Sequence, residues 1–214
     1  MEKYDLLPKQ LMHEGTCDRD DFFPPKPLSD QTVKTIHQSD YVDRLKRQDL
    51  NRSEIRKIGF PISQQLVERE FVIAGGTVEG ALKSLQSGIS FNIAGGTHHA
   101  YSAHGEAFCM LNDQAIAAQY LLDHHHAQRI LIIDLDVHQG NGTAEIFKNE
   151  DRVFTFSMHG QKNYPFKKEQ SDWDIPLEDK TGDERYLNVL NDTLPQLFEQ
   201  VDPDFVFYLS GVDV

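Results

Sequence analysis

The sequence predicts an α/β fold with a mainly parallel sheet that is covered by helices on both faces. From residue 89 onwards, short apolar segments alternate with longer segments of helical periodicity. Such continuous apolar runs are typical of parallel strands, which are buried on both sides. The clusters of His and Asp residues follow these runs, at the sheet edge where ligands bind in this fold class.

The first 60 residues are polar and charged, with short helical candidates such as 30–37 and a fixed Pro-rich loop at 22–25. Residues 63–86 have apolar residues at helical spacing, and Gly75 and Gly76 either interrupt this helix or allow close packing. The remaining expected elements are strands at 89–93, 130–136, 152–158 and 204–210, helices at 113–125, 143–148 and 183–199 with a kink or break at Pro195, and an irregular stretch at 159–182.

The composition is that of one globular domain of ordinary size, with 214 residues and a formal charge of −13. This charge disfavours direct binding to nucleic acid, and it would suit a basic substrate, although acidic surfaces also simply keep proteins soluble. Cys17 and Cys109 suggest neither a ligand pair nor a disulfide framework. Without a signal segment or a membrane span, the expected location is cytoplasmic.

Residues 130–142 combine a predicted buried strand with a cluster of polar side chains. Asp134, Asp136 and His138 are spaced two residues apart, so they would point the same way where the strand ends. A carboxylate and an imidazole in that position can hold a divalent metal. A strand followed by a polar turn with surface Asp residues would give the same pattern, so the interpretation needs a second site.

His98 and His99 provide that second site, because they follow Gly95-Gly96-Thr97 just past the predicted strand at 89–93. An imidazole in such a loop can act as a general base. His124–His126 are a second run of adjacent histidines, and they serve as a comparison for His98 and His99. They lie at the end of an amphipathic helix and are expected to face solvent.

Three motifs in this order resemble the zinc-dependent histone deacetylase family, which includes acetoin-utilisation proteins and acetylpolyamine amidohydrolases. They are His98-His99, residues 108–113 and residues 134–142, and the Gln-Gly-Asn-Gly variant is most similar to class IV and bacterial members. The similarity runs along essentially the whole chain. It implies the three-layer α/β/α arginase/deacetylase fold, here as a single partial domain over 1–214 that is incomplete in its C-terminal part.

The resemblance implies one catalytic Zn²⁺, with Asp136 and His138 as two of its three protein ligands. The family's third ligand, an Asp, and its transition-state Tyr would both lie beyond Val214, whereas Asp213 matches a non-ligand Asp. The start of the chain also resembles a segment inside longer relatives. We therefore expect an inactive fragment whose parent removes acyl groups from protein lysine, a polyamine or a related small amine.

In the same resemblance, His99 matches the residue that takes a proton from water and later protonates the leaving amine. His98 matches its partner, which Asp134 would orient. Asn141 stands where many members have a second Asp, and an uncharged partner would leave His99 less basic.

Phe108 and Tyr164 would form opposite walls of a narrow tunnel for the acyl-lysine stem. Without the resemblance, Phe108 is better interpreted as an ordinary core aromatic residue. The family also binds a monovalent cation, K⁺ or Na⁺, through backbone oxygens, and the matching positions here are Asp134, Asp136, His138, Ser157 and Met158.

Two other functions remain open. An arginase-type ureohydrolase shares the fold and uses two Mn²⁺, but it needs a further Asp where this chain has Gly140. A non-catalytic module that binds acyl-lysine or a partner protein would suit a chain without the third ligand. Metal stoichiometry distinguishes the first alternative, and titration with an acyl-lysine peptide tests the second.

Overall fold

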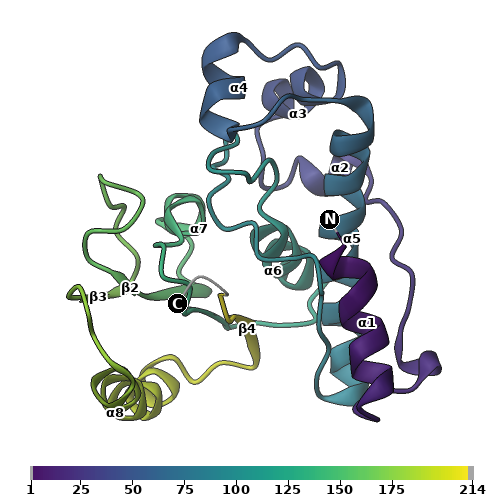
Figure 1. Cartoon of the computed structure of the whole chain (residues 1–214). Coiled ribbons are helices and arrows are strands. Elements are labelled where there is room, and N and C mark those ends of the chain that lie inside the picture. The colour runs from purple at the N-terminus through teal and green to yellow at the C-terminus, as the bar shows by residue number, and fades with distance from the viewer. Residues whose placement is uncertain (1, 212–214) are drawn as a thin grey trace.

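The computed structural model describes residues 2–211, and a parallel sheet lies at its centre. The strand order is β3-β2-β1-β4, and helices cover both faces of the sheet (Figure 1). The predicted α/β class is therefore confirmed. The strands are β1 (Ile130–Asp134), β2 (Val153–Gly160), β3 (Trp173–Leu177) and β4 (Phe205–Leu209).

The N-terminal third is helical, and several of its helices start or end at ordinary capping residues. Asn51 caps α4, Ser63 caps α5, and Gly59 ends α4 in the left-handed conformation. The helices are α1 (Lys3–His13), the 3₁₀ helix η1 (Arg19–Asp21), α2 (Asp30–Val33), α3 (Ser39–Lys46), α4 (Arg52–Ile58), α5 (Gln64–Ser87), α6 (Asp113–Asp123), α7 (Asn141–Phe147) and α8 (Asp183–Val201). None of the helices in the described part of the chain combines the length and apolarity that a bilayer span requires.

Alternation along β1 divides the core into two layers. Ile130 and Ile132 pack with residues of α5 and α6, whereas Leu131 and Ile133 pack with α8 on the other face. Figure 1 shows α8 alone on its side of the sheet. This burial on both faces fixes the register of β1, and with it the place where the strand's final residue emerges.

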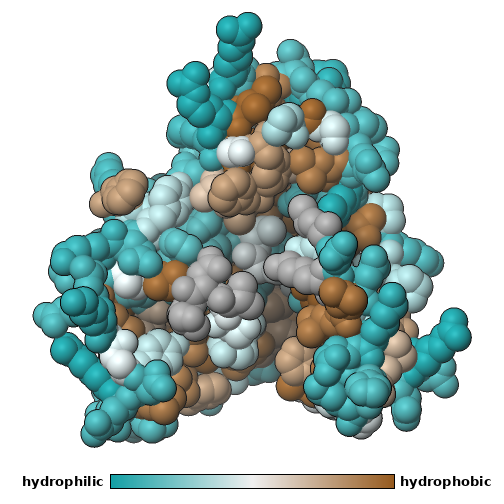
Figure 2. Space-filling model, in the orientation of Figure 1, coloured by the Kyte–Doolittle hydropathy of each residue, from teal (hydrophilic) through white to brown (hydrophobic). Residues whose placement is uncertain are grey.

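Residues 89–93 were expected to form a strand, and this prediction is wrong. Ile89 and Phe91 are 65% and 76% exposed, and the segment lies outside the sheet. A strand needs a neighbour to pair its backbone groups, and here a cavity of about 930 Å³ is lined by both this segment and β4. Figure 2 shows apolar residues gathered around the hollow on this side of the molecule.

The stretch at 159–182 is not wholly irregular, because it contains β3. Pro176 has no N–H to donate, which is compatible with a strand at the edge of the sheet. The expected break at Pro195 is also absent, since α8 continues through it. Gly75 lies within the unbroken α5, and a Cβ there would overlap the Lys26 carbonyl oxygen, so the close-packing alternative is confirmed.

Candidate active site and metal-ligand pair

The candidate site lies at the carboxyl edge of the sheet, where β1 ends at Asp134. Asp134 Oδ1 accepts a hydrogen bond from the Asp136 backbone N–H at 3.0 Å, and Asp136 Oδ1 accepts one from the His138 N–H at 2.8 Å. These local bonds shape the loop between β1 and α7. Gly140 then passes so close to Asp134 that a Cβ would overlap its carboxylate.

His98 and His99 reach this edge on a loop that is anchored by Asp113, the first residue of α6. The Asp113 carboxylate accepts hydrogen bonds from the backbone N–H groups of Gly96 and Thr97 and from the Thr97 hydroxyl. The sequence pattern did not reveal this anchor, because an Asp in the first turn of a helix indicates only where the helix begins.

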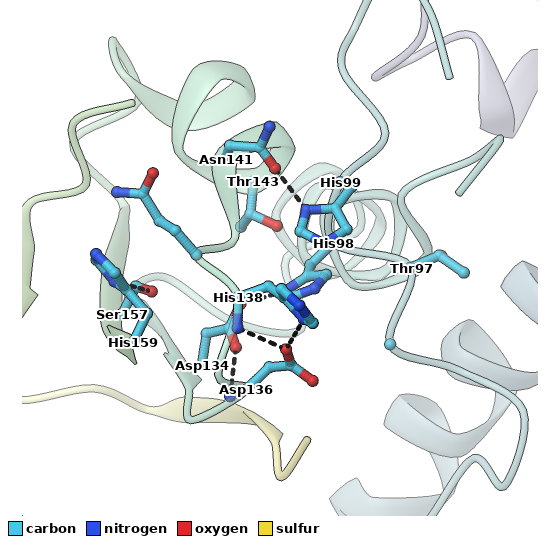
Figure 3. Close-up of polar contacts among 12 residues, drawn as sticks. Thr97, His98, His99, Asp134, Asp136, His138, Asn141, Thr143, Ser157 and His159 are labelled. Carbon is cyan, nitrogen blue, oxygen red and sulfur yellow. Dashed lines mark hydrogen bonds and ion pairs between the residues drawn. The ribbon is translucent and has the colours of Figure 1, made fainter. Parts of the chain in front are cut away.

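His98 is oriented by a buried carboxylate, as the sequence predicts. Its Nδ1 donates a hydrogen bond to Asp134 Oδ2 at 2.6 Å (Figure 3), and the two residues are 5% and 3% exposed. Burial lowers the pKa of His98, but the charge of Asp134 and this hydrogen bond outweigh burial, so the net effect is a raised pKa.

His99 has a neutral partner instead. Its Nδ1 donates to Oδ1 of Asn141, the first residue of α7, at 2.6 Å. This bond leaves Nε2 of the neutral ring with a free lone pair. Burial and the repulsion from His98 lower the pKa of His99 to about 3, so the ring is neutral at ordinary pH and can accept a proton.

Asp136 and His138 present two donor atoms that suit a metal ion. Asp136 Oδ1 lies 2.9 Å from His138 Nδ1. Tetrahedral zinc would separate such atoms by about 3.4 Å, so a small side-chain rotation admits the ion. Among residues 2–211 no three His, Cys, Asp or Glu side chains are grouped to hold a metal, and Asp213 lies outside the described residues. The pair therefore fits two ligands of a zinc site.

The proton-transfer candidates and the ligand pair lie side by side. The ring centroids of His99 and His138 are 5.9 Å apart in an edge-on arrangement. The chain after β4 also reaches this place, since a Cβ on Gly211 would meet Asp136. The residues that two separate motifs predict for one site are thus brought together at one point.

Tyr164 lies at the site, whereas Phe108 is an exposed residue on the protein surface. The Tyr164 ring is 5.0 Å from that of His99, edge-on, and its hydroxyl donates a hydrogen bond to Glu106. Phe108 is 66% exposed and stacks on Phe60 at 5.8 Å. The interpretation of Phe108 as a core residue is therefore wrong.

Ser157 lies opposite Asp134 in the paired strands β1 and β2, and Met158 follows it. The Ser157 hydroxyl is 3.0 Å from Nδ1 of His159, a buried imidazole whose pKa is lowered by desolvation. Strand spacing alone gave no reason to select His159. A monovalent cation held by backbone oxygens here stays a prediction.

Two polar residues that the motifs did not single out complete the network behind His99. Tyr101 and Glu106 both accept hydrogen bonds from Asn141 Nδ2, at 3.1 and 3.2 Å. Their only sequence signal is nearness to the His98-His99 motif, and nothing in the pattern indicated that both would turn toward α7.

Comparison with known proteins agrees with this geometry. Residues 1–214 match the family model described as the histone deacetylase domain. The chain is 42% identical over 213 residues to an uncharacterized protein of Picosynechococcus sp., covering 100% of this chain and 71% of that protein. It is 31% identical to histone deacetylase 1 of Oryza sativa subsp. japonica, covering 95% of this chain and 43% of that protein.

A bacterial relative and a solved structure extend the comparison. The acetoin utilization protein AcuC of Staphylococcus aureus is 28% identical over 98% of this chain and 59% of its own length. The crystal structure of an HDAC homolog from Aquifex aeolicus superposes with a TM-score of 0.77 at 26% identity, covering 90% of this chain and 57% of that one. The chain thus spans 43% to 71% of the length of these four proteins.

Proposed function

The chain belongs to the histone deacetylase family, and we propose that its polar cluster is the site of a zinc-dependent amidohydrolase. The reaction would remove an acyl group, in the first instance acetyl, from the ε-amine of lysine or from a polyamine or related small amine. The expected location is the cytoplasm. The observation that carries the proposal is the contrast between two adjacent imidazoles: His98 bonds a carboxylate, whereas His99 bonds a neutral amide beside Asp136 and His138.

Asp136 and His138 would hold the metal, together with a further ligand from outside residues 2–211. When bound, Zn²⁺ would polarise the amide carbonyl and make a water molecule nucleophilic near neutral pH. Nε2 of His99 would take the proton from that water, because its Nδ1–H is engaged by Asn141. The same nitrogen would then deliver the proton to the leaving amine.

His98 would support this transfer through charge. Its bond to Asp134 holds the ring in place and favours its protonated form. A protonated His98 next to His99 lowers the basicity of the latter, which suits a group that must give its proton back to the amine within one turnover.

The substrate would enter past Phe108 and Tyr164, with the acyl-lysine methylenes between aromatic faces. K⁺ or Na⁺ held by backbone oxygens of Asp134, Asp136, His138, Ser157 and Met158 would stabilise the loop that carries the ligands. A second candidate function is acyl-lysine binding without hydrolysis. It is favoured by residues 2–211 taken by themselves, because they provide a ligand pair and not a ligand triad.

The test measures hydrolysis of an acetyl-lysine peptide and an acetylated polyamine, with and without Zn²⁺. It uses the full open reading frame that contains residues 1–214. We expect zinc-dependent hydrolysis and its loss in His99→Ala. Hydrolysis that survives His99→Ala, or two metals per chain, would contradict the mechanism.

A further inference from the structure

Glu106 sends a carboxylate into the polar network behind His99. Its side chain is only 17% exposed. Its Oε1 accepts hydrogen bonds from the Tyr164 hydroxyl and from Asn141 Nδ2, the latter at 3.2 Å. One carboxylate oxygen therefore joins the turn before Phe108 to α7 and to the loop after β2.

The other oxygen of Glu106 faces outward to basic groups. Oε2 lies 3.2 Å from His104 Nε2 and 4.0 Å from Lys57 Nζ. The hydrogen bond with His104 in the first place, and that with Tyr164, hold the pKa of Glu106 at about 2 despite burial. The group that faces Asn141 is therefore a carboxylate, which can only accept hydrogen bonds.

An acceptor at this point decides which way the Asn141 carboxamide turns. Its NH₂ group must face Glu106, and its second N–H is accepted by the Tyr101 hydroxyl at 3.1 Å. The Tyr101 hydroxyl in turn donates to Glu169 at 3.2 Å. Only Oδ1 of Asn141 is then left to face His99.

The orientation of the carboxamide decides the tautomer of His99. Oδ1 of Asn141 accepts from Nδ1 at 2.6 Å, so the hydrogen must lie on Nδ1 and the lone pair on Nε2. The opposite orientation would put an NH₂ group against Nδ1 and move the hydrogen to Nε2. A base with that hydrogen cannot accept a proton from water.

We propose that Glu106 is a positioning residue, which fixes the Asn141 carboxamide and through it the Nδ1–H tautomer of His99. Glu106 also supplies a negative charge behind Asn141, the neutral residue that bonds the imidazole of His99 directly. The inference rests on the proposed function, in which His99 is the base, but the tautomer itself is measurable without metal, substrate or turnover.

The test is ¹⁵N NMR of the imidazole nitrogens in residues 1–214, free of metal, at a pH where His99 is neutral. In the unsubstituted protein we expect the Nδ1–H tautomer alone. In Glu106→Gln, the new amide can donate as well as accept, so we expect the Nε2–H tautomer in about half of the molecules. His99 that keeps the pure Nδ1–H form in Glu106→Gln would overturn the proposal.

Three further variants separate positioning from a general structural effect. Glu145→Gln is the matched control, because its side chain is 23% exposed, lies on α7 and bonds Ser102 instead. Glu106→Asp keeps an acceptor-only group and should retain most of the Nδ1–H form. In an Asn141→Asp background the partner of His99 can itself only accept, so adding Glu106→Gln should leave the tautomer unchanged.

Two results would count against the proposal in these variants. One is an equal tautomer shift in Glu145→Gln, and the other is a shift from Glu106→Gln that persists in the Asn141→Asp background. Kinetics on the full open reading frame add a separate readout, in which Glu106→Gln should lower kcat about tenfold with KM little changed. Absence of hydrolysis by the unsubstituted protein contradicts the proposed function, whereas an unchanged tautomer contradicts this inference alone.

Discussion

The role of Asp113 as the anchor of the His98-His99 loop can be tested with Asp113→Asn, which replaces one carboxylate oxygen by an amide nitrogen. The carboxylate is 2% exposed and is surrounded by donors. Oδ1 accepts from Thr97 N at 2.8 Å, Thr97 Oγ1 at 2.7 Å and Gly96 N at 3.1 Å, and Oδ2 accepts from Thr77 Oγ1 at 2.5 Å. An amide keeps one acceptor oxygen, loses the charge, and turns an NH₂ group toward other donors.

The expected cost follows from these bonds. The three charge-assisted bonds that Oδ1 accepts should each weaken by about 1 kcal/mol, which gives a loss of about 3 kcal/mol in the free energy of unfolding. With a urea m-value of about 2 kcal/mol/M, the midpoint should fall by about 1.5 M. Unfolding is followed by far-ultraviolet circular dichroism and by fluorescence of Trp173, the single tryptophan.

The control is Asp123→Asn at the other end of α6. That carboxylate is exposed and accepts one side-chain bond, from Gln119 at 2.7 Å, so its midpoint should move by less than about 0.3 M. A midpoint shift of less than about 0.3 M for Asp113→Asn would refute the reasoning. The hydrogen bonds from the donors around Asp113 would then not depend on its charge.

Three further predictions concern stability, packing and binding. Burial raises the pKa of Glu70 to about 7. The stability that the protonated Glu70 contributes is therefore present below its unfolded-state pKa and is lost as the pH rises to about 7. Glu70→Gln should remove about 3 kcal/mol of this pH dependence of the unfolding free energy, which urea unfolding at pH 5 and 8 would check. Gly75→Ala should destabilise by about 2 kcal/mol or more, because its Cβ would overlap the Lys26 carbonyl oxygen, and an unchanged Tm would contradict this packing. Phe108→Ala should change the unfolding free energy by less than about 1 kcal/mol, since the ring is 66% exposed, yet weaken acyl-lysine peptide binding about tenfold by calorimetry; equal affinity would exclude a tunnel role.

The sequence predicted most of the sheet because strand burial leaves a pattern. β1, β2 and β4 are each apolar runs, and both sides of β1 are covered. The segment at 89–93 has the same local pattern, but a strand also needs a partner, and that information is not local. β3 was missed for the converse reason, since Asp174 and Pro176 interrupt the apolar pattern of this edge strand.

The candidate site was predictable where its residues follow strands. Asp134, Asp136 and His138 share a two-residue spacing, and the structure brings them beside His98 and His99. The residues that hold those groups were not predictable. Which donors surround a carboxylate such as Asp113 or Glu106 depends on loops that meet only in the folded chain.

Anomalous X-ray scattering at the zinc absorption edge tests the metal-ligand pair of Asp136 and His138 most directly. Crystals of the full open reading frame, or of residues 1–214 soaked in Zn²⁺, should show one peak about 2.1 Å from both Asp136 Oδ1 and His138 Nδ1. The exposed His124–His126 run offers the ion an alternative on the same chain. Zinc on that run, with no peak between Asp136 and His138, would contradict the account.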